Sequence, residues 1–184
     1  LPASSAASDV YKRQARDSAG ILDASTLGKI DIQGTDASEF LNRVYTNAWS
    51  KLAIGKCRYG LMLNEDGMVY DDGVTTRLDE NHYIMTTTTG GAATVLGKLE
   101  DYLQTEWPEL DVYLTSVTDH YATISVCGPN SKKIISKVIP EIDLSDEKFP
   151  HMSFKNAKID KVKCRVMRIS SVSYTHLRAH ETRE

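Results

Sequence analysis

Hydrophobic and polar positions alternate along several short segments of this chain, and alternation of this kind predicts β-strands. The clearest segments are residues 27–33, 57–64, 68–78 and 82–88. Weaker alternation predicts further strands over residues 111–117, 121–127, 155–159 and 163–169. We expect strands 111–117 and 121–127 to pair with each other, because they are neighbours along the chain.

Three other segments place apolar residues three or four positions apart, which is the spacing of an amphipathic α-helix. The first is expected to begin after Asp36, with Glu39 in the position of a capping box. Its apolar stripe consists of Ala37, Phe40, Leu41, Val44 and Ala48. Two more helices are predicted over residues 92–104 and 131–139. Strands dominate and helices lie between strand pairs, so we predict an α+β fold with a mostly antiparallel sheet.

Two adjacent carboxylates interrupt the strongest strand pair. Residues 57–64 and 68–78 form a hairpin with a tight turn at Asp66-Gly67, and the second strand carries Asp71 and Asp72. Acidic residues are poor strand formers, and a buried carboxylate is costly unless a donor or ligand satisfies it. Successive strand residues point to opposite faces, so the two carboxylates cannot share one site.

Composition narrows the classes of protein and partner. The chain has 184 residues, enough for one domain with a full core, and its net charge is −3. Binding nucleic acid needs clustered positive charge, and spanning a membrane needs about 20 consecutive apolar residues. Neither is present, so we expect no nucleic acid and no membrane as partner. Three cysteines without C-x-x-C spacing predict reduced, buried thiols in a cytoplasmic protein and no metal site.

The two ends of the chain differ from its middle. Residues 1–14 and 172–184 show no period of helix or strand, and both resemble translated sequencing-adapter read-through. We predict that they are non-native tails, with ordinary disordered tails as the alternative. The predicted domain is therefore 15–171.

The hairpin segment, residues 58–73, resembles the folate-binding domain family that includes the glycine-cleavage T-protein (aminomethyltransferase), dimethylglycine dehydrogenase and the large subunit of heterotetrameric sarcosine oxidase. Within this family the sarcosine oxidase alpha subunit is the most similar. The resemblance is also carried by residues 22–30, 40–47, 86–93 and 101–108. It implies the N-terminal part of a folate-binding aminomethyltransferase-like domain, incomplete at its C-terminus and cut from a larger polypeptide.

The resemblance also implies functional residues. Asp72 matches the family acid that contacts tetrahydrofolate, so it is the expected catalytic and folate-binding residue. Tyr59 matches an aromatic residue of the folate pocket, and Leu27 matches an apolar pocket wall; core packing is the alternative for both. We expect Asp72 to stand inward beside Tyr59 at the mouth of a cleft shaped for a pterin. Asp71, which faces the other way, is expected to be structural.

Two threonines complete the expected folate site. Thr86 and Thr88 match family positions that meet the pterin, and alternation places them on one face of their strand. Relatives of the T-protein type carry an Asn at the position of Thr88 and a Tyr at that of Thr76. These departures favour the sarcosine oxidase branch.

For that branch, the resemblance implies capture of the one-carbon unit from sarcosine oxidation as 5,10-methylenetetrahydrofolate. Reduced folate and the other sarcosine oxidase subunits are the implied partners. Flavins and NAD would belong to parts of the parent enzyme outside this chain, so the chain alone is expected not to oxidise sarcosine. Two alternatives stay open: a glycine-cleavage aminomethyltransferase, and a non-catalytic folate-binding module of the kind linked to iron–sulfur or tRNA maintenance.

Overall fold

The chain is divided into two compact units in the computed structural model, which describes residues 13–169 and 179–183. One unit is the continuous segment Ser25–Tyr121. The other combines the residues up to Ala24 with those from Ala122 onward. Both units contribute to the predicted domain 15–171, and each is described by itself below.

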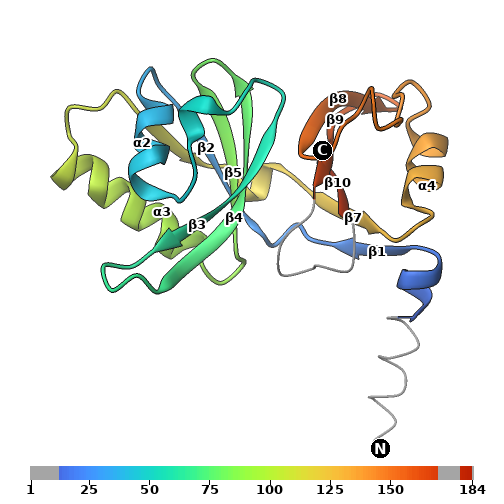
Figure 1. The fold of residues 1–184 in the computed structure, drawn as a ribbon, viewed down its shortest axis with the longest axis horizontal. Helices are drawn as coiled ribbons and strands as arrows, with labels where there is room; N and C mark the ends of the chain where they lie inside the picture. The colour runs from blue at the N-terminus through green and yellow to red at the C-terminus, as the bar shows by residue number, and fades with distance from the viewer. Residues whose placement is uncertain (1–12, 170–178, 184) are drawn as a thin grey trace, which may run out of the picture. The chain divides into compact units, whose positions relative to one another are not determined.

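The sheet of the continuous unit carries the hairpin predicted from the sequence (Figure 1). Its strands pair in the order β3-β4-β5-β2-β6, and each of these pairings is antiparallel. The strong strand predictions are confirmed to within one or two residues. The strand bounds are Gly28–Gln33 for β2, Cys57–Leu63 for β3, Val69–Asp79 for β4, His82–Thr87 for β5 and Tyr113–Ser116 for β6.

Helices α2 (Ala37–Val44) and α3 (Ala92–Asp101) lie on one side of this sheet (Figure 1). Their apolar stripes are buried, and full burial of one Leu or Phe side chain contributes about 1.5–3 kcal/mol. The core combines residues of both helices with residues of the sheet, including Phe40, Leu41, Val95, Leu99, Ile30, Ile32, Tyr83 and Met85. Short helices η1 (Trp49–Lys51), η2 (Tyr102–Glu106) and η3 (Thr118–His120) connect the larger elements.

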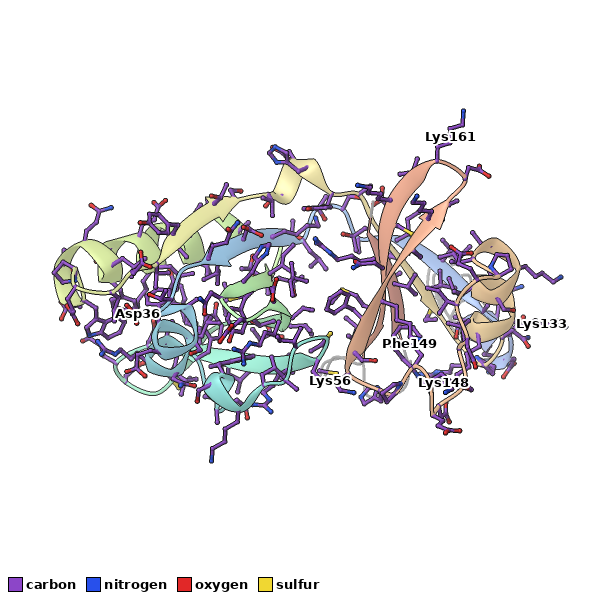
Figure 2. All side chains as sticks on the ribbon, turned by 90° about the horizontal axis from the view of Figure 1, so that it is seen from above. Asp36, Lys56, Lys133, Lys148, Phe149 and Lys161 are labelled. Atoms are coloured by element: carbon purple, nitrogen blue, oxygen red, sulfur yellow. The ribbon has the colours of Figure 1, made fainter. Side chains whose placement is uncertain are left out.

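Three details of the predicted helices are wrong. Asp36 stands at the start of α2 (labelled in Figure 2), but its side chain makes no capping bond. Its Oδ2 instead accepts the backbone N–H of Asp111 at 2.9 Å. The helix ends at Val44, so Ala48 is exposed rather than part of the buried stripe. The segment predicted as one helix over 92–104 changes from α-helix to the π-helical η2 at Tyr102.

The second unit is another antiparallel sheet, with strand order β1-β7-β10-β9-β8. Its core includes Val126, Ile135, Phe149 and Val166. Lys161 marks the turn between β8 and β9 in Figure 2. The element bounds are Gly20–Asp23 for β1, Thr123–Cys127 for β7, Ser131–Val138 for α4, Ser153–Ile159 for β8, Val162–Ile169 for β9 and Ala179–Arg183 for β10.

The predicted pairing of segments 111–117 and 121–127 is wrong. Both contain strands, but β6 pairs with β2, whereas β7 pairs with β1 and β10. Strand β10 lies within the predicted tail 172–184, and its backbone pairs with β7 and β9. Backbone pairing does not distinguish native from non-native sequence, so the non-native tails stay a prediction. Residues 1–12, 172–178 and 184 of these tails lie outside the described residues, as do residues 170–171 at the end of the predicted domain.

Candidate functional site

The β3–β4 hairpin separates the two carboxylates as the sequence predicts. Asp66-Gly67 forms its turn, and Gly67 has φ +78°, a conformation that glycine adopts without strain. In the ladder, Leu61 lies opposite Asp72, and Met62 lies opposite Asp71. Asp71 is buried with 4% of its surface exposed, whereas Asp72 is half-buried on the other face.

Asp72 and Tyr59 form a direct pair on this second face. The Tyr59 hydroxyl donates to Oδ2 of Asp72 at 2.7 Å. Burial raises the pKa of Tyr59 to about 12, and the hydrogen bond to Asp72 and its charge add to the rise. The phenol therefore stays a donor at neutral pH. The hydroxyl of Tyr59 and the carboxylate of Asp72 are in direct contact, so no cleft separates these two groups, and a ligand has to lie against the pair rather than between them.

Asp71 fixes the start of α3. Its Oδ1 accepts the Thr88 hydroxyl at 2.6 Å, and its Oδ2 accepts the Thr88 backbone N–H at 3.3 Å. The Thr88 hydroxyl accepts the N–H of Gly91, which precedes the helix. Burial raises the pKa of Asp71, although the bonds from Thr88 lower it. These contacts agree with the structural role that we expected for Asp71.

The predicted common face of Thr86 and Thr88 is not seen. Strand β5 ends at Thr87, so Thr88 lies beyond the regular alternation and bonds to Asp71. Thr86 is buried, and its hydroxyl accepts the N–H of Val74 at 2.9 Å and donates to the carbonyl oxygen of Val74 at 3.2 Å. Thr86 and Thr88, the two threonines predicted to contact the ligand, therefore form hydrogen bonds with different residues of β4.

Leu27 lies beside the Thr88 segment. The β2–β5 ladder pairs Gly28 with Thr87, and the hydroxyls of Thr26 and Thr89 are 3.1 Å apart. This register places Leu27, which is half-buried, opposite Thr88. Its carbonyl oxygen also accepts a hydrogen bond from the ammonium group of the buried Lys29. The structure thus brings Leu27 to the predicted site from the neighbouring strand.

Tyr45 is a site neighbour that the sequence reasoning missed. It bridges to Met62, which lies opposite Asp71, so Tyr45, Met62 and Asp71 form one row across the sheet. Burial raises the pKa of the Tyr45 phenol, and the charges of Asp71 and Asp72 raise it further. Among the described residues its hydroxyl has no hydrogen-bond partner. Its position after the end of α2 gives no periodic signal that could have identified it.

A surface hollow of about 290 Å³ lies elsewhere in the same unit. None of the predicted site residues lines it. Arg43 at its rim is already paired with Glu39 and Glu109 and stacks on Trp107. The lining residues are Arg43, Val44, Met62, Leu63, Glu65, Tyr102, Glu106 and Trp107. We therefore assign the candidate site to the Tyr59–Asp72 pair, where the half-buried acceptor and the aromatic ring meet.

Cys57 and Cys164 are buried and Cys127 is half-buried, and none of the three forms a disulfide within the described part of the chain. No group of three potential metal-binding side chains is found in the part of the chain that the structure describes. No described helix is long and apolar enough to cross a bilayer.

Comparisons with known proteins agree with this architecture. The chain is 54% identical over 164 residues to the sarcosine oxidase subunit alpha of Corynebacterium sp. (strain P-1), covering 88% of the chain and 17% of that subunit. It thus spans about a sixth of the length of this relative. It is 30% identical over 145 residues to the aminomethyltransferase of Chloroherpeton thalassium, covering 79% of the chain and 39% of that protein.

The fold is shared with a solved structure, aminomethyltransferase T of the glycine cleavage system from Bartonella henselae. The TM-score is 0.76 at 22% identity, with 93% of this chain and 43% of that chain covered. This likeness confirms the predicted α+β fold. The GCVT N-terminal domain family matches residues 5–176. The chain therefore belongs to the family of the GCVT N-terminal domain.

Proposed function

We propose that this chain is the tetrahydrofolate-binding portion of a sarcosine oxidase alpha subunit. In this role it captures the one-carbon unit released by sarcosine oxidation as 5,10-methylenetetrahydrofolate. The Tyr59–Asp72 pair is the observation that carries the proposal. The 54% identity to a subunit named sarcosine oxidase subunit alpha, against 30% to an aminomethyltransferase, favours this branch of the family.

The donors and acceptors at the pair suit a reduced folate. A pterin is a flat ring with N–H donors on its edge, and a carboxylate accepts such donors while an aromatic side chain packs against the flat face. Among the described residues, Tyr59 is the one donor of a hydrogen bond to the side chain of Asp72, and an ionised carboxylate has about four lone-pair positions. Asp72 can therefore accept a ligand N–H while it stays bonded to Tyr59.

In the proposed mechanism tetrahydrofolate supplies the amine nitrogens that take up the one-carbon unit. Asp72 orients the folate and accepts a proton at its carboxylate as the new C–N bond forms. Tyr59 holds the carboxylate in place through its hydroxyl, and its ring excludes water from one side of the pair. Flavin and NAD chemistry, the oxidation of sarcosine and the contacts with other subunits are assigned to the parent enzyme, which we propose to be cytoplasmic.

Calorimetry with folinic acid tests this function. We expect the 184-residue chain to bind folinic acid and the Asp72→Asn variant to bind about tenfold more weakly, because an amide carries no charge and accepts with one oxygen only. Asp79→Asn, on the exposed end of the same strand, is the matched control and should bind as the unaltered chain does. Equal affinity for folinic acid in all three proteins would show that Asp72 does not contact the folate.

An aminomethyltransferase of the glycine-cleavage type is the second candidate, supported by the likeness in sequence and fold to that class. Both candidates bind folate, so affinity does not separate them. The gene upstream does: sequence that encodes a dinucleotide-binding region in the same reading frame supports sarcosine oxidase. A start codon directly before the described domain supports the aminomethyltransferase.

A further inference from the structure

The β4–β5 ladder stops just before the candidate site. Backbone pairing runs from Asp79 and His82 to Thr75 and Met85. Beyond that point, two threonine side chains connect the strands instead of further pairs. In the first connection the Thr86 hydroxyl makes two hydrogen bonds: it accepts one from the N–H of Val74 and donates one to the carbonyl oxygen of Val74.

The second connection is the pair of bonds from Thr88 to the Asp71 carboxylate. Val74 and Asp71 flank Asp72 and Gly73 along β4, so the two connections enclose the residue that carries the candidate chemistry. Asp71 and Thr86 are 4% and 7% exposed. The bonds of Thr86 are therefore shielded from water and hold their geometry more strongly than exposed ones, whereas Thr88 is exposed and its bonds to Asp71 are only partly shielded.

Two glycines permit the close approach of these segments. A Cβ atom on Gly73 would lie 1.8 Å from the carbonyl oxygen of Thr86, which no side chain can tolerate. A Cβ atom on Gly91 would lie 2.7 Å from both Oδ1 of Asp71 and Oγ1 of Thr88. A residue larger than glycine at position 73 would therefore collide with the backbone of Thr86. At position 91 it would collide with the two side-chain oxygens that join Asp71 to Thr88. The segment after Met85 is packed tightly against the strand that presents Asp72.

We propose that Asp71, Thr86 and Thr88 form a side-chain clamp that positions Asp72 against Tyr59. The clamp's relevance to a ligand rests on the proposed function. In the clamp, Thr86 acts through β4 and not on a ligand, because its one O–H already donates to Val74. Asp71 likewise acts through Thr88. All three are positioning residues, and Asp72 is the group that meets the ligand.

The ionisation of Tyr59 reports the clamp directly and needs no folate. In ¹³Cζ-tyrosine NMR of the full chain, with Tyr59→Phe to assign the signal, Tyr59 should stay protonated from about pH 9 to about pH 11. In Thr86→Val and in Asp71→Ala we expect Asp72 to leave Tyr59, so that the pKa of the phenol loses the part of its rise that the Asp72 hydrogen bond and charge cause, keeps the part that burial causes, and lies below that of the unaltered chain. Thr86→Ser keeps the hydroxyl and should restore the unaltered titration, whereas Asp71→Asn keeps an acceptor oxygen and should lower the pKa of Tyr59 only by the small direct effect of the lost Asp71 charge.

Folinic acid affinity is the second measurement. We expect Thr86→Val and Asp71→Ala to bind about tenfold more weakly, while Thr86→Ser and Asp71→Asn stay within about threefold of the unaltered chain. Only variants with native circular dichroism are compared, and Thr88→Val replaces either one that does not fold. An unchanged Tyr59 titration in the Val and Ala variants overturns the clamp. A shifted titration in a chain that does not bind folinic acid supports the clamp and overturns the proposed function.

Discussion

At the scale of single residues, Asp71 and Asp72 show how one step along a strand separates two environments. The sequence predicted opposite faces from alternation alone, and the structure places Asp71 against Thr88 and Asp72 against Tyr59. The Asp71–Thr88 bond could not be predicted, because Thr88 lies past the end of β5, where alternation no longer applies. The same limit explains why the common face of Thr86 and Thr88 was wrong.

The raised pKa of Asp71 predicts a pH-dependent cost of keeping its charge buried. The pKa of Asp71 is higher in the folded chain than in the unfolded chain. Its favourable contribution to the free energy of unfolding is therefore complete below about pH 4, and this contribution is lost as pH rises through the folded pKa. Asp71→Asn keeps an acceptor oxygen for Thr88 and cannot ionise. We therefore expect the variant to gain stability relative to the unaltered chain as pH rises from about 4 to about 7.

Urea unfolding followed by tryptophan fluorescence measures this difference. Both tryptophans of the chain, Trp49 and Trp107, lie in the unit that contains Asp71, so the signal reports that unit. The free energies of unfolding of the two proteins should be closest at the acid end of the range. A difference that stays constant with pH would show that Asp71 titrates alike in the folded and unfolded chains.

At the scale of elements, the sequence predicted strands and helices well but not their partners. Period-2 and period-3.6 patterns are local, so β2 to β5 and the buried stripe of α2 were recovered. The pairing of β6 with β2 joins segments about 80 residues apart, and no local pattern encodes that choice. Neighbouring strands pair in roughly two-thirds of cases, which made the wrong pairing of β6 with β7 the natural expectation.

Asp36 illustrates the same competition between local and distant partners. Instead of capping α2, its carboxylate accepts the N–H of Asp111 in the loop that leads to β6, and its backbone N–H donates to the carbonyl of Asp111. We expect Asp36→Ala to lower the free energy of unfolding by about 1 kcal/mol, through this loop rather than through the helix terminus. Asp36→Asn retains the acceptor oxygen and should cost less.

Amide hydrogen exchange distinguishes the two explanations for such a loss. If the bond to the loop is what matters, exchange at Asp111 accelerates in Asp36→Ala and stays slow in Asp36→Asn. If Asp36 acts as a helix cap instead, the amides of the first turn of α2 accelerate and Asp111 does not change. The prediction fails in the second case, whatever the total change in stability.

At the scale of the whole molecule, the two units have separate hydrophobic clusters. Each has a carboxylate with a shifted pKa, Asp71 upward and Asp146 downward, so acid changes the stability of the two units in opposite directions. Hydrogen bonds from Lys132 and Arg168 lower the pKa of Asp146, in the unit without tryptophan, to about 2. Its contribution to stability is therefore present above about pH 4 and is lost as pH falls through about 2. The contribution of Asp71 to the stability of the other unit is already complete below about pH 4, so it is retained over that range.

The consequence is a testable order of acid unfolding. Arg168 is only 6% exposed and also donates to the carbonyl of Phe149, so protonation of Asp146 leaves a buried guanidinium without its carboxylate. We expect circular dichroism to lose part of its signal between about pH 4 and about pH 2 while tryptophan fluorescence stays native. Because the side chain of Asp146 is 75% exposed, solvent screens the pair, so Asp146→Asn should stay folded near neutral pH and show only a small fall in the free energy of unfolding of this unit. Coincident transitions by both probes would mean that the two units unfold together, and that the Asp146–Arg168 pair does not set the acid limit of its own unit.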